Sequence, residues 1–184
     1  AGRAVIDRWL LSRLAELVRQ VTDLMDGYDI TAAGRKIEQF VDDLSNWYVR
    51  RGRERYWGSE LTQDKIDAYM TLYTVLESFA RLTAPFTPFI AEEIYQNIVR
   101  SVDADAPLSV HMCRYPQADE ARFDAALEAE MDAAAAALAS CLWLQDGICP
   151  EVVEIELPGG RRFVTEVGAL GCPRCGVVKD AGDD

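Results

Sequence analysis

The sequence has few of the residues on which enzyme active sites depend. Among its 184 residues there is a single histidine, His111, and no glycine-rich phosphate loop. His111 has no partners for a catalytic triad, and its neighbour Cys113 offers only a weak hint of a metal site. We therefore predict that this chain contains no catalytic residues.

Long apolar runs and regularly spaced cysteines are also missing. No run of about 18 apolar residues could span a bilayer, so we expect a soluble protein with no membrane partner. The five cysteines are an odd number at irregular spacing, which argues against a secreted disulfide framework and favours the reducing cytoplasm. The chain opens AGRAVIDRWL, without an initiator Met, and we expect it to be a piece of a longer protein.

Negative charge dominates the chain but is unevenly distributed. The formal net charge is -12, yet residues 1–57 carry ten Lys and Arg against nine Asp and Glu. Within residues 47–57 there are four arginines and one glutamate. The local field in that stretch is therefore positive, although the whole chain repels polyanions at long range.

Apolar residues recur at helical spacing through the first half of the chain. A first stripe predicts a helix up to Gly27, and a second predicts an antiparallel helix that weakens at Gly52 and ends by Gly58. The two stripes, which we expect to face each other, are Leu10, Leu14, Leu17, Val21, Leu24 and Tyr28 in the first helix and Ile37, Val41, Leu44 and Tyr48 in the second. Ala33, Phe40 and Trp47 form another apolar row, so the second helix is expected to be covered on more than one side.

Further helices follow these two. Thr62 is a plausible N-cap for a third, whose common face is Ile66, Tyr69, Tyr73, Leu76 and Ala80. Pro85 ends that helix, and Thr87 with Pro88 begins a fourth. We expect a short extended segment at SVHMCRYP and an acidic helix over about residues 119–139.

The C-terminal tail has a different pattern. VVEIEL and RRFVTEV alternate apolar and polar residues around a Pro-Gly-Gly turn, which predicts a β-hairpin. GCPRCG follows, with Cys172 and Cys175 at the spacing of half a zinc site. Four ligands are needed, and Cys141 and Cys149 lack the usual spacing, so we expect a metal-free chain with reduced thiols.

The stretch DLSNWYVRRGRERYW, residues 43–57, allows two interpretations. In the first, it is a helix end whose arginines are solvated and paired with neighbouring acids. In the second, arginines neutralise phosphates while aromatic rings stack on unpaired bases. The candidate RNA-binding residues are Arg50, Arg51, Arg53, Arg55, Tyr56 and Trp57. Trp47 and Tyr48 are expected to pack mainly inside, and the adjacent Asp42 and Asp43 point too far apart to form a catalytic pair.

Three motifs make the sequence resemble a known family. DRWLLSRL, FVDDLSNWYVRRGRERYW and LTAPFTPFIAEEIYQNIV, the last followed by SVHMCRYP, resemble successive motifs of the helical anticodon-binding domain of isoleucyl-tRNA synthetases, which are class I enzymes. The resemblance covers roughly residues 5–135, and DLSNWYVRR is closer to the isoleucine enzymes than to their valine and leucine relatives. GCPRCGVVKDAGDD resembles the first half of a zinc finger found at the C-terminus of many bacterial members, whose second cysteine pair would fall past Asp184.

The resemblance implies a fold and a function. The fold is a mainly α bundle over residues 1–140, with a small β and cysteine-knuckle tail over residues 141–184. The parent enzyme joins isoleucine to its tRNA with ATP and Mg²⁺, and this part binds the anticodon stem-loop. The family's ATP-binding motifs are absent here, so the chain alone should be inactive. The alternative is a helical protein-interaction or assembly domain that does not bind RNA.

Overall fold

The computed structural model describes residues 2–143, 152–156 and 162–166, and these are mainly helical. They divide into two compact units, an N-terminal unit, Ala1–Asp124, and a C-terminal unit, Ala125–Asp184. The α-helices of the N-terminal unit are α1 (Val5–Asp26), α2 (Ile30–Asp42), α3 (Arg53–Trp57), α4 (Gln63–Thr83) and α5 (Pro88–Tyr95). Two π-helices, η1 (Asp43–Val49) and η2 (Gln96–Arg100), extend α2 and α5. Two short 3₁₀ helices, η3 (Val110–Met112) and η4 (Glu120–Arg122), complete this unit.

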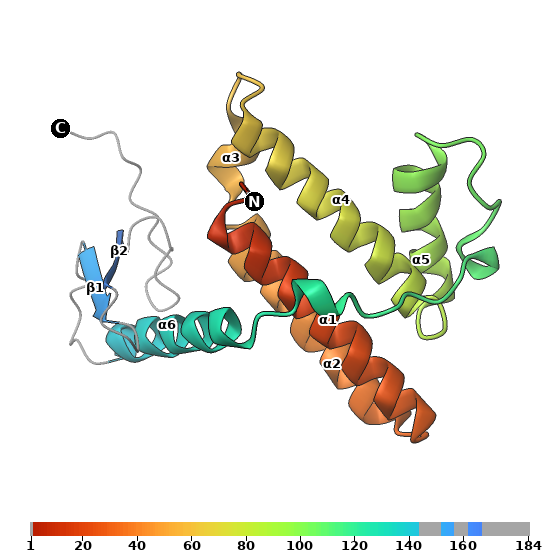
Figure 1. Ribbon diagram of the computed structural model, residues 1–184, viewed down its shortest axis with the longest axis horizontal. Helices are drawn as coiled ribbons and strands as arrows, with labels where there is room; N and C mark the ends of the chain where they lie inside the picture. Colours follow the sequence, from red (N-terminus) through yellow and green to blue (C-terminus); the bar gives the residue numbers. More distant parts are fainter. Residues whose placement is uncertain (1, 144–151, 157–161, 167–184) are drawn as a thin grey trace. The chain divides into compact units, whose positions relative to one another are not determined.

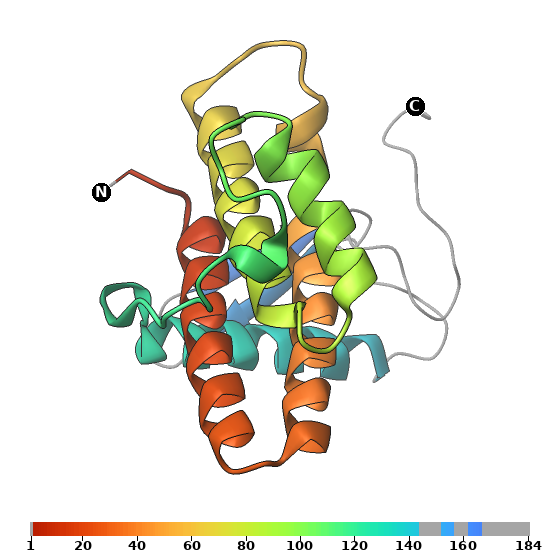
Figure 2. The ribbon, with the colours of Figure 1, turned by 90° about the vertical axis from the view of Figure 1, so that its right-hand side faces the viewer.

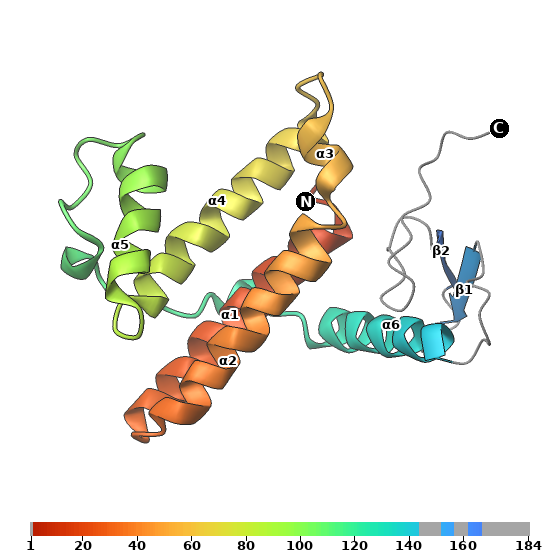
Figure 3. The same cartoon turned by 180° about the vertical axis from the view of Figure 1, so that it is seen from behind.

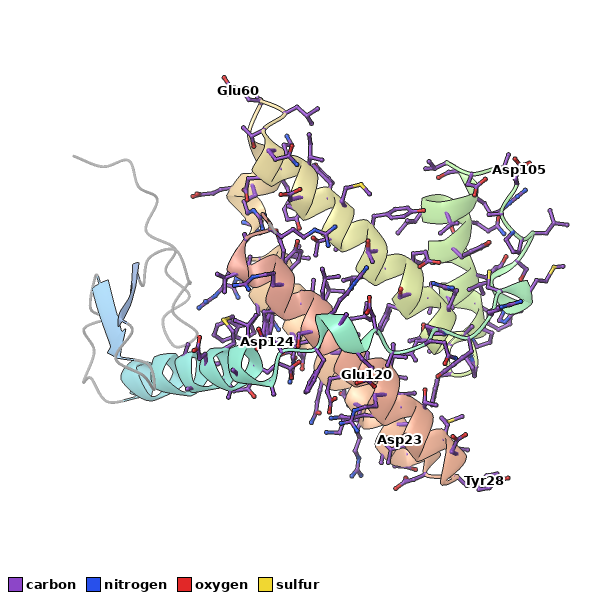
Figure 4. The ribbon with its side chains drawn as sticks, viewed as in Figure 1. Asp23, Tyr28, Glu60, Asp105, Glu120 and Asp124 are labelled. Carbon is purple, nitrogen blue, oxygen red and sulfur yellow. The ribbon has the colours of Figure 1, made fainter. Side chains whose placement is uncertain are left out.

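Helices α1 and α2 lie side by side and antiparallel (Figure 2). Their corner is made by Tyr28, which has a φ of 61° and is 89% exposed, at the tip seen in Figure 4. The expectation that Tyr28 continues the buried stripe is therefore wrong, because the chain has already turned away from the helix axis there. Asp29 caps α2 by accepting a hydrogen bond from the Ala32 amide at 3.0 Å.

The π-helix η1 decides which side of the second helix is buried. The amide of Arg50 donates to the carbonyl of Ser45 at 3.0 Å, five residues back. Phe40, Leu44 and Tyr48 are all buried, whereas Val41 is 40% exposed. Successive steps of four residues drift by about 40° around an α-helix, and the wider π-turn offsets this drift. The predicted stripe is thus confirmed at Leu44 and Tyr48 and wrong at Val41.

Helix α4 packs against α1, and α5 packs against α4 (Figure 1 and Figure 3). Thr62 caps α4, as predicted, through a 3.2 Å hydrogen bond from the Lys65 amide. The predicted buried face of this helix is wrong at Ile66 and Tyr69, which are exposed. The fully buried positions of α4 are mostly smaller residues, which permit close helix packing; they are Ala68, Thr71, Val75, Ala80 and Leu82.

The segment after α5 is held by a carboxylate. Glu92 accepts hydrogen bonds from the hydroxyl of Ser109 at 2.8 Å and from the amide of Val110 at 2.9 Å. Val110 is buried in a second core cluster between α4 and α5. The predicted extended conformation of SVHMCRYP is therefore wrong at Val110–Met112, which form η3, and is confirmed at the flanking Ser109 and Cys113, whose backbones are extended.

In the C-terminal unit, α6 (Ala125–Trp143) begins six residues later than about residue 119, where the acidic helix was predicted to start. Strands β1 (Val152–Glu156) and β2 (Arg162–Glu166) pair antiparallel, with Val152 opposite Glu166. Cys149, Cys172 and Cys175 lie outside the described residues, so the predicted cysteine knuckle does too. In the described part of the chain, no helix has the length and apolar character needed to cross a membrane.

Candidate nucleic-acid interface

The candidate residues lie on the turn and short helix that follow η1 (Figure 1). Gly52 separates η1 from α3 and is buried. A Cβ at Gly52 would lie 2.8 Å from the carbonyl oxygen of Tyr48 and 3.2 Å from the ring of Tyr56. Only glycine fits this close approach, so the chain turns tightly and α3 starts against the end of η1.

The segment carries accessible positive charge and an exposed aromatic ring. Arg50 and Arg53 are exposed, and Trp57 is 73% exposed. The guanidinium carbon of Arg53 lies 4.8 Å from the centroid of the Trp57 ring. Four residues apart on α3, the two side chains share a face, as the sequence predicts. Together they present a cation and a π-surface side by side.

Arg51 and Trp47 form a second pair of the same kind. The guanidinium carbon of Arg51 lies 3.9 Å from the centroid of the Trp47 ring, and both side chains are half-buried. Burial lowers the pKa of Arg51, which nevertheless remains cationic at neutral pH. The charge is therefore retained but is less accessible than the charge of Arg50 or Arg53.

Arg55 points away from this face and is engaged with acidic side chains. Its Nη1 and Nη2 atoms donate to the two carboxylate oxygens of Asp7, each at 2.8 Å. Nε and Nη2 donate to Asp64 at 2.7 and 2.8 Å. These bonds, led by the one to Asp7, raise the pKa of Arg55 above its ordinary value. The guanidinium of Arg55 is thus occupied by protein carboxylates.

Tyr48 and Tyr56 lie behind the exposed face. Tyr48 is buried, as predicted, and its hydroxyl donates to Asp7 at 2.7 Å. Burial, with hydrogen bonds involving Tyr56 and Asp7, raises the pKa of Tyr48. Tyr56 is half-buried and meets the ring of Tyr69 edge to face, with centroids 5.2 Å apart. Tyr56 therefore has less free ring surface to offer a base than Trp57 has.

Sequence reasoning missed Asp7 and Asp64, the two acids that hold Arg55. A signal for Asp7 was present, because it precedes Leu10 and Leu14 by steps of three and four and so continues their buried stripe. An acid on an apolar helix face requires a partner when it is buried. Asp64 gave no such signal, because it is more than half exposed and sits in the first turn of α4, where acids are common.

The adjacent acids Asp42 and Asp43 have no shared site. Asp43 accepts two hydrogen bonds from Arg13, at 2.7 and 3.0 Å, while Asp42 is exposed. The carboxylates of this pair therefore do not converge, as predicted. Among the described residues, no cluster of three or more His, Cys, Asp or Glu side chains could hold a metal ion.

The exposed groups define the chemistry of the surface. Exposed guanidinium groups attract phosphate, and an exposed indole stacks on an unpaired base whatever its identity. The acidic neighbours Glu54 and Glu60 are also exposed, with Glu60 on the turn after α3 (Figure 4). The basic surface is thus small and bordered by negative charge, which limits it to a local polyanion contact.

The helical fold and this surface agree with the comparison with known families. The family model described as "Anticodon-binding domain of tRNA ligase" matches residues 7–141. The chain belongs to this family of anticodon-binding domains.

Among individual proteins, the chain is similar to isoleucine–tRNA ligases. It is 54% identical to that of Clostridium novyi over 130 residues, which are 71% of this chain and 12% of the relative. It is 55% identical to that of Dehalococcoides mccartyi over 126 residues, 68% of this chain and 12% of the relative. For the ligase of Thermus thermophilus the identity is 49% over 132 residues, 71% of this chain and 13% of the relative. The chain thus matches about an eighth of the length of these curated relatives.

Proposed function

We propose that this chain is the anticodon-binding part of an isoleucine–tRNA ligase and binds the anticodon stem-loop of isoleucine tRNA. The observation that carries the proposal is the family match over residues 7–141, which includes the whole basic and aromatic stretch. The chain is 54% and 55% identical in sequence to two isoleucine–tRNA ligases, which supports isoleucine as the amino acid that the parent enzyme attaches.

Within the stretch, the accessible groups have the strongest support as RNA contacts. Arg50 and Arg53 are exposed cations, and Trp57 is the most exposed ring of the stretch. Arg51 and Tyr56 contribute from half-buried positions at the edge of the surface. Arg55 belongs to the same segment, but its guanidinium binds Asp7 and Asp64.

Salt-dependent binding of a synthetic isoleucine anticodon stem-loop tests the proposal. We expect the affinity to fall steeply with salt, because binding to phosphates releases counterions. Arg50→Ala and Arg53→Ala should each lower the slope of log affinity against log salt by about one for each phosphate that the variant no longer neutralises. Arg35→Ala is the matched control, because Arg35 is an exposed arginine on α2 outside the basic stretch.

Three results would count against the proposal. If the unaltered chain binds the stem-loop no better than an unrelated RNA hairpin, the RNA-binding function is wrong. If Arg50→Ala and Arg53→Ala behave like Arg35→Ala, the anticodon is bound elsewhere. Salt-insensitive association with a protein would favour the alternative of a helical interaction domain.

The parent enzyme would supply the chemistry that this chain lacks. In that proposal, ATP and Mg²⁺ bind another domain, which activates isoleucine, and the remaining domains of the synthetase and the tRNA are the partners of this chain in the cytoplasm. Changes at Arg50 or Arg53 should then reduce the apparent affinity for tRNA and leave activation of isoleucine by ATP unchanged.

The arrangement of the C-terminal tail as a hairpin with a cysteine knuckle stays a prediction. We propose a small β-hairpin followed by a cysteine knuckle at Cys172 and Cys175, which supplies two of the four ligands that zinc requires. Metal analysis of the purified chain checks this: we expect less than one equivalent of zinc, and a full equivalent would require two more ligands from the chain.

A further inference from the structure

The short helix α3 carries the exposed Arg53 and Trp57 but has no buried residue of its own. A helix of five residues is far too short to be stable in isolation. Its position must therefore come from contacts with other elements. The side chain of Arg55, only 17% exposed, makes the most extensive of these contacts.

Arg55 joins α3 to two long helices at once. Asp7, fully buried in the first turn of α1, receives both terminal nitrogens of the guanidinium. Asp64, in the first turn of α4, receives Nε and Nη2, and its carbonyl oxygen lies 3.2 Å from Nη2. A planar guanidinium can donate to two carboxylates in this way, and an ammonium group cannot.

Tyr48 extends the network to η1. Its hydroxyl lies 2.7 Å from Asp7 and 3.2 Å from the carbonyl oxygen of Ala68. The carboxylate of Asp7 thus accepts three hydrogen bonds and is fully compensated in its buried site. One connected set of bonds therefore links α1, η1, α3 and α4.

The directions of the side chains on α3 connect this network to the exposed surface. Residues two apart on a helix point to roughly opposite sides, so Arg55 faces the bundle while Arg53 and Trp57 face outward. The 4.8 Å contact between Arg53 and Trp57 holds that outward pair together. When Arg55 is bound to its carboxylates, the outward face of α3 has one fixed orientation.

We infer that Arg55 is a positioning residue for the RNA-binding surface: it binds Asp7 and Asp64 so that α3 holds Arg53 and Trp57 outward, and it makes no contact with RNA itself. The inference rests on the proposed function for its RNA part. A preorganised surface binds more tightly because fewer side chains must be ordered on association.

Arg55→Lys is the variant that tests the inference, because it keeps the charge and removes the planar fork. We expect the affinity for the synthetic anticodon stem-loop to fall about tenfold, the cost of ordering Arg53 and Trp57 on binding. The fall should be equal at every salt concentration, with the salt slope unchanged, because the same phosphates are still neutralised. Hydrogen–deuterium exchange of the amides of residues 53–58 should become faster, while the amides of the α1 core keep their protection.

Asp64 provides a second test that leaves the buried Asp7 untouched. Asp64→Asn should weaken stem-loop binding and speed exchange in α3, whereas Asp64→Glu, which keeps a carboxylate, should retain most of both. If Asp64 contributed only to stability, its variants would lower the melting temperature, but Asp64→Asn and Asp64→Glu would bind RNA with the same affinity. Arg13→Lys is the matched control, because Arg13 is a part-buried arginine that binds Asp43 outside this network.

The outcomes distinguish the inference from the function on which it rests. A lower salt slope for Arg55→Lys, with exchange in α3 unchanged, would mean that Arg55 contacts phosphate, and the positioning role would be wrong. Unchanged affinity with faster exchange would mean that α3 does not present the RNA contacts. If the unaltered chain does not bind the stem-loop, the proposed function and the RNA role of Arg55 both fail, and exchange alone still reports whether Arg55 fixes α3.

Discussion

Gly52 has no side chain, and this absence lets the chain turn tightly between η1 and α3. Its φ of -79° suits any residue, so the constraint is the space next to Tyr48 and Tyr56. We expect Gly52→Ala to reduce the free energy of unfolding by about 1–3 kcal/mol, because the added methyl group overpacks this contact. Urea unfolding measures the change, which follows from the 2.8 Å approach to a backbone oxygen that cannot rotate away.

A second glycine of the same helical region gives the matched control. A Cβ at Gly34, within α2, has no neighbour within 4 Å. Gly34→Ala should therefore stabilise the protein by about 0.5–1 kcal/mol, because alanine loses less backbone entropy in a helix. Equal effects of the two substitutions would contradict the role assigned to Gly52.

Trp57 combines an exposed ring with an adjacent cation, Arg53, and is therefore the aromatic residue of the basic stretch best suited to stack on a base. A large ring that is 73% exposed leaves apolar surface in water unless something covers it. We expect Trp57→Ala to weaken stem-loop binding by about 1–3 kcal/mol through loss of base stacking, measured by titration at fixed salt. Phe89→Ala is the control, because Phe89 is 90% exposed on α5, and a similar weakening there would indicate non-specific binding.

At the residue scale, the charged and aromatic stretch could be found from the sequence, but the role of each residue in it could not. Arg53 and Arg55 look equivalent in the sequence, yet one is exposed and the other binds two carboxylates. The difference depends on Asp7, which lies 48 residues earlier in the chain. Local patterns cannot reveal such a partner, although a buried acid on an apolar stripe indicates that one is needed.

At the element scale, the bundle depends on the face that the α2 and η1 segment buries. Leu44 is 8% exposed and Phe40 stacks on Phe79 of α4, with ring centroids 5.6 Å apart. We expect Leu44→Ala to cost about 2–5 kcal/mol of unfolding free energy, because it leaves a cavity in this core. Chemical denaturation followed by far-UV circular dichroism gives the value.

Val41 supplies the comparison for this prediction. It was assigned to the same buried stripe as Leu44, but it is 40% exposed. Val41→Ala should therefore change stability by less than about 0.5–1 kcal/mol. If Val41→Ala lowered the free energy of unfolding as much as Leu44→Ala does, Val41 would be a core residue, and the buried face would be the one predicted from α-helical spacing.

The elements themselves were largely predictable, because apolar periodicity and capping residues are local signals. The two long helices at the start, the Thr62 cap and the start of α5 at Pro88 all followed from the sequence. The π-helix and η3 did not: the buried Tyr48 of η1 binds Asp7 of α1, and η3 is held by Glu92, seventeen residues before Ser109. Tertiary contacts override local preference at both places.

At the scale of the whole molecule, acidic pH should weaken the fold. Arg55 lowers the pKa of Asp64 and Arg19 lowers that of Glu16, from ordinary values of 3.8 and 4.5. A carboxyl whose folded pKa is lowered contributes stability that is complete above about pH 5.5 and is lost as the pH falls through the folded value. We expect the free energy of unfolding to be flat from about pH 6 to 8 and to decline below about pH 5, measured by urea titrations across pH.

The Asp64→Asn variant separates this contribution from general acid effects. It lacks the carboxyl that titrates, so its stability should decline less between about pH 5 and 3 than that of the unaltered chain. A stability curve that stays flat to about pH 3 in the unaltered chain would contradict the prediction.

The π-helical turn of η1 has a consequence for how the length of this segment can change in evolution. Its five-residue hydrogen-bond step accommodates one residue more than an α-helix over the same number of turns. Deleting one residue would restore the α-helical step over the same number of turns, so the segment that follows would keep nearly the same direction. Arg55 would then still point to Asp7, and Arg53 with Trp57 would still point outward. We therefore expect related chains to exchange the exposed Ser45 and Asn46 freely and to tolerate the loss of one residue between residues 43 and 49, whereas the loss of two would rotate α3 by about 100° and be selected against.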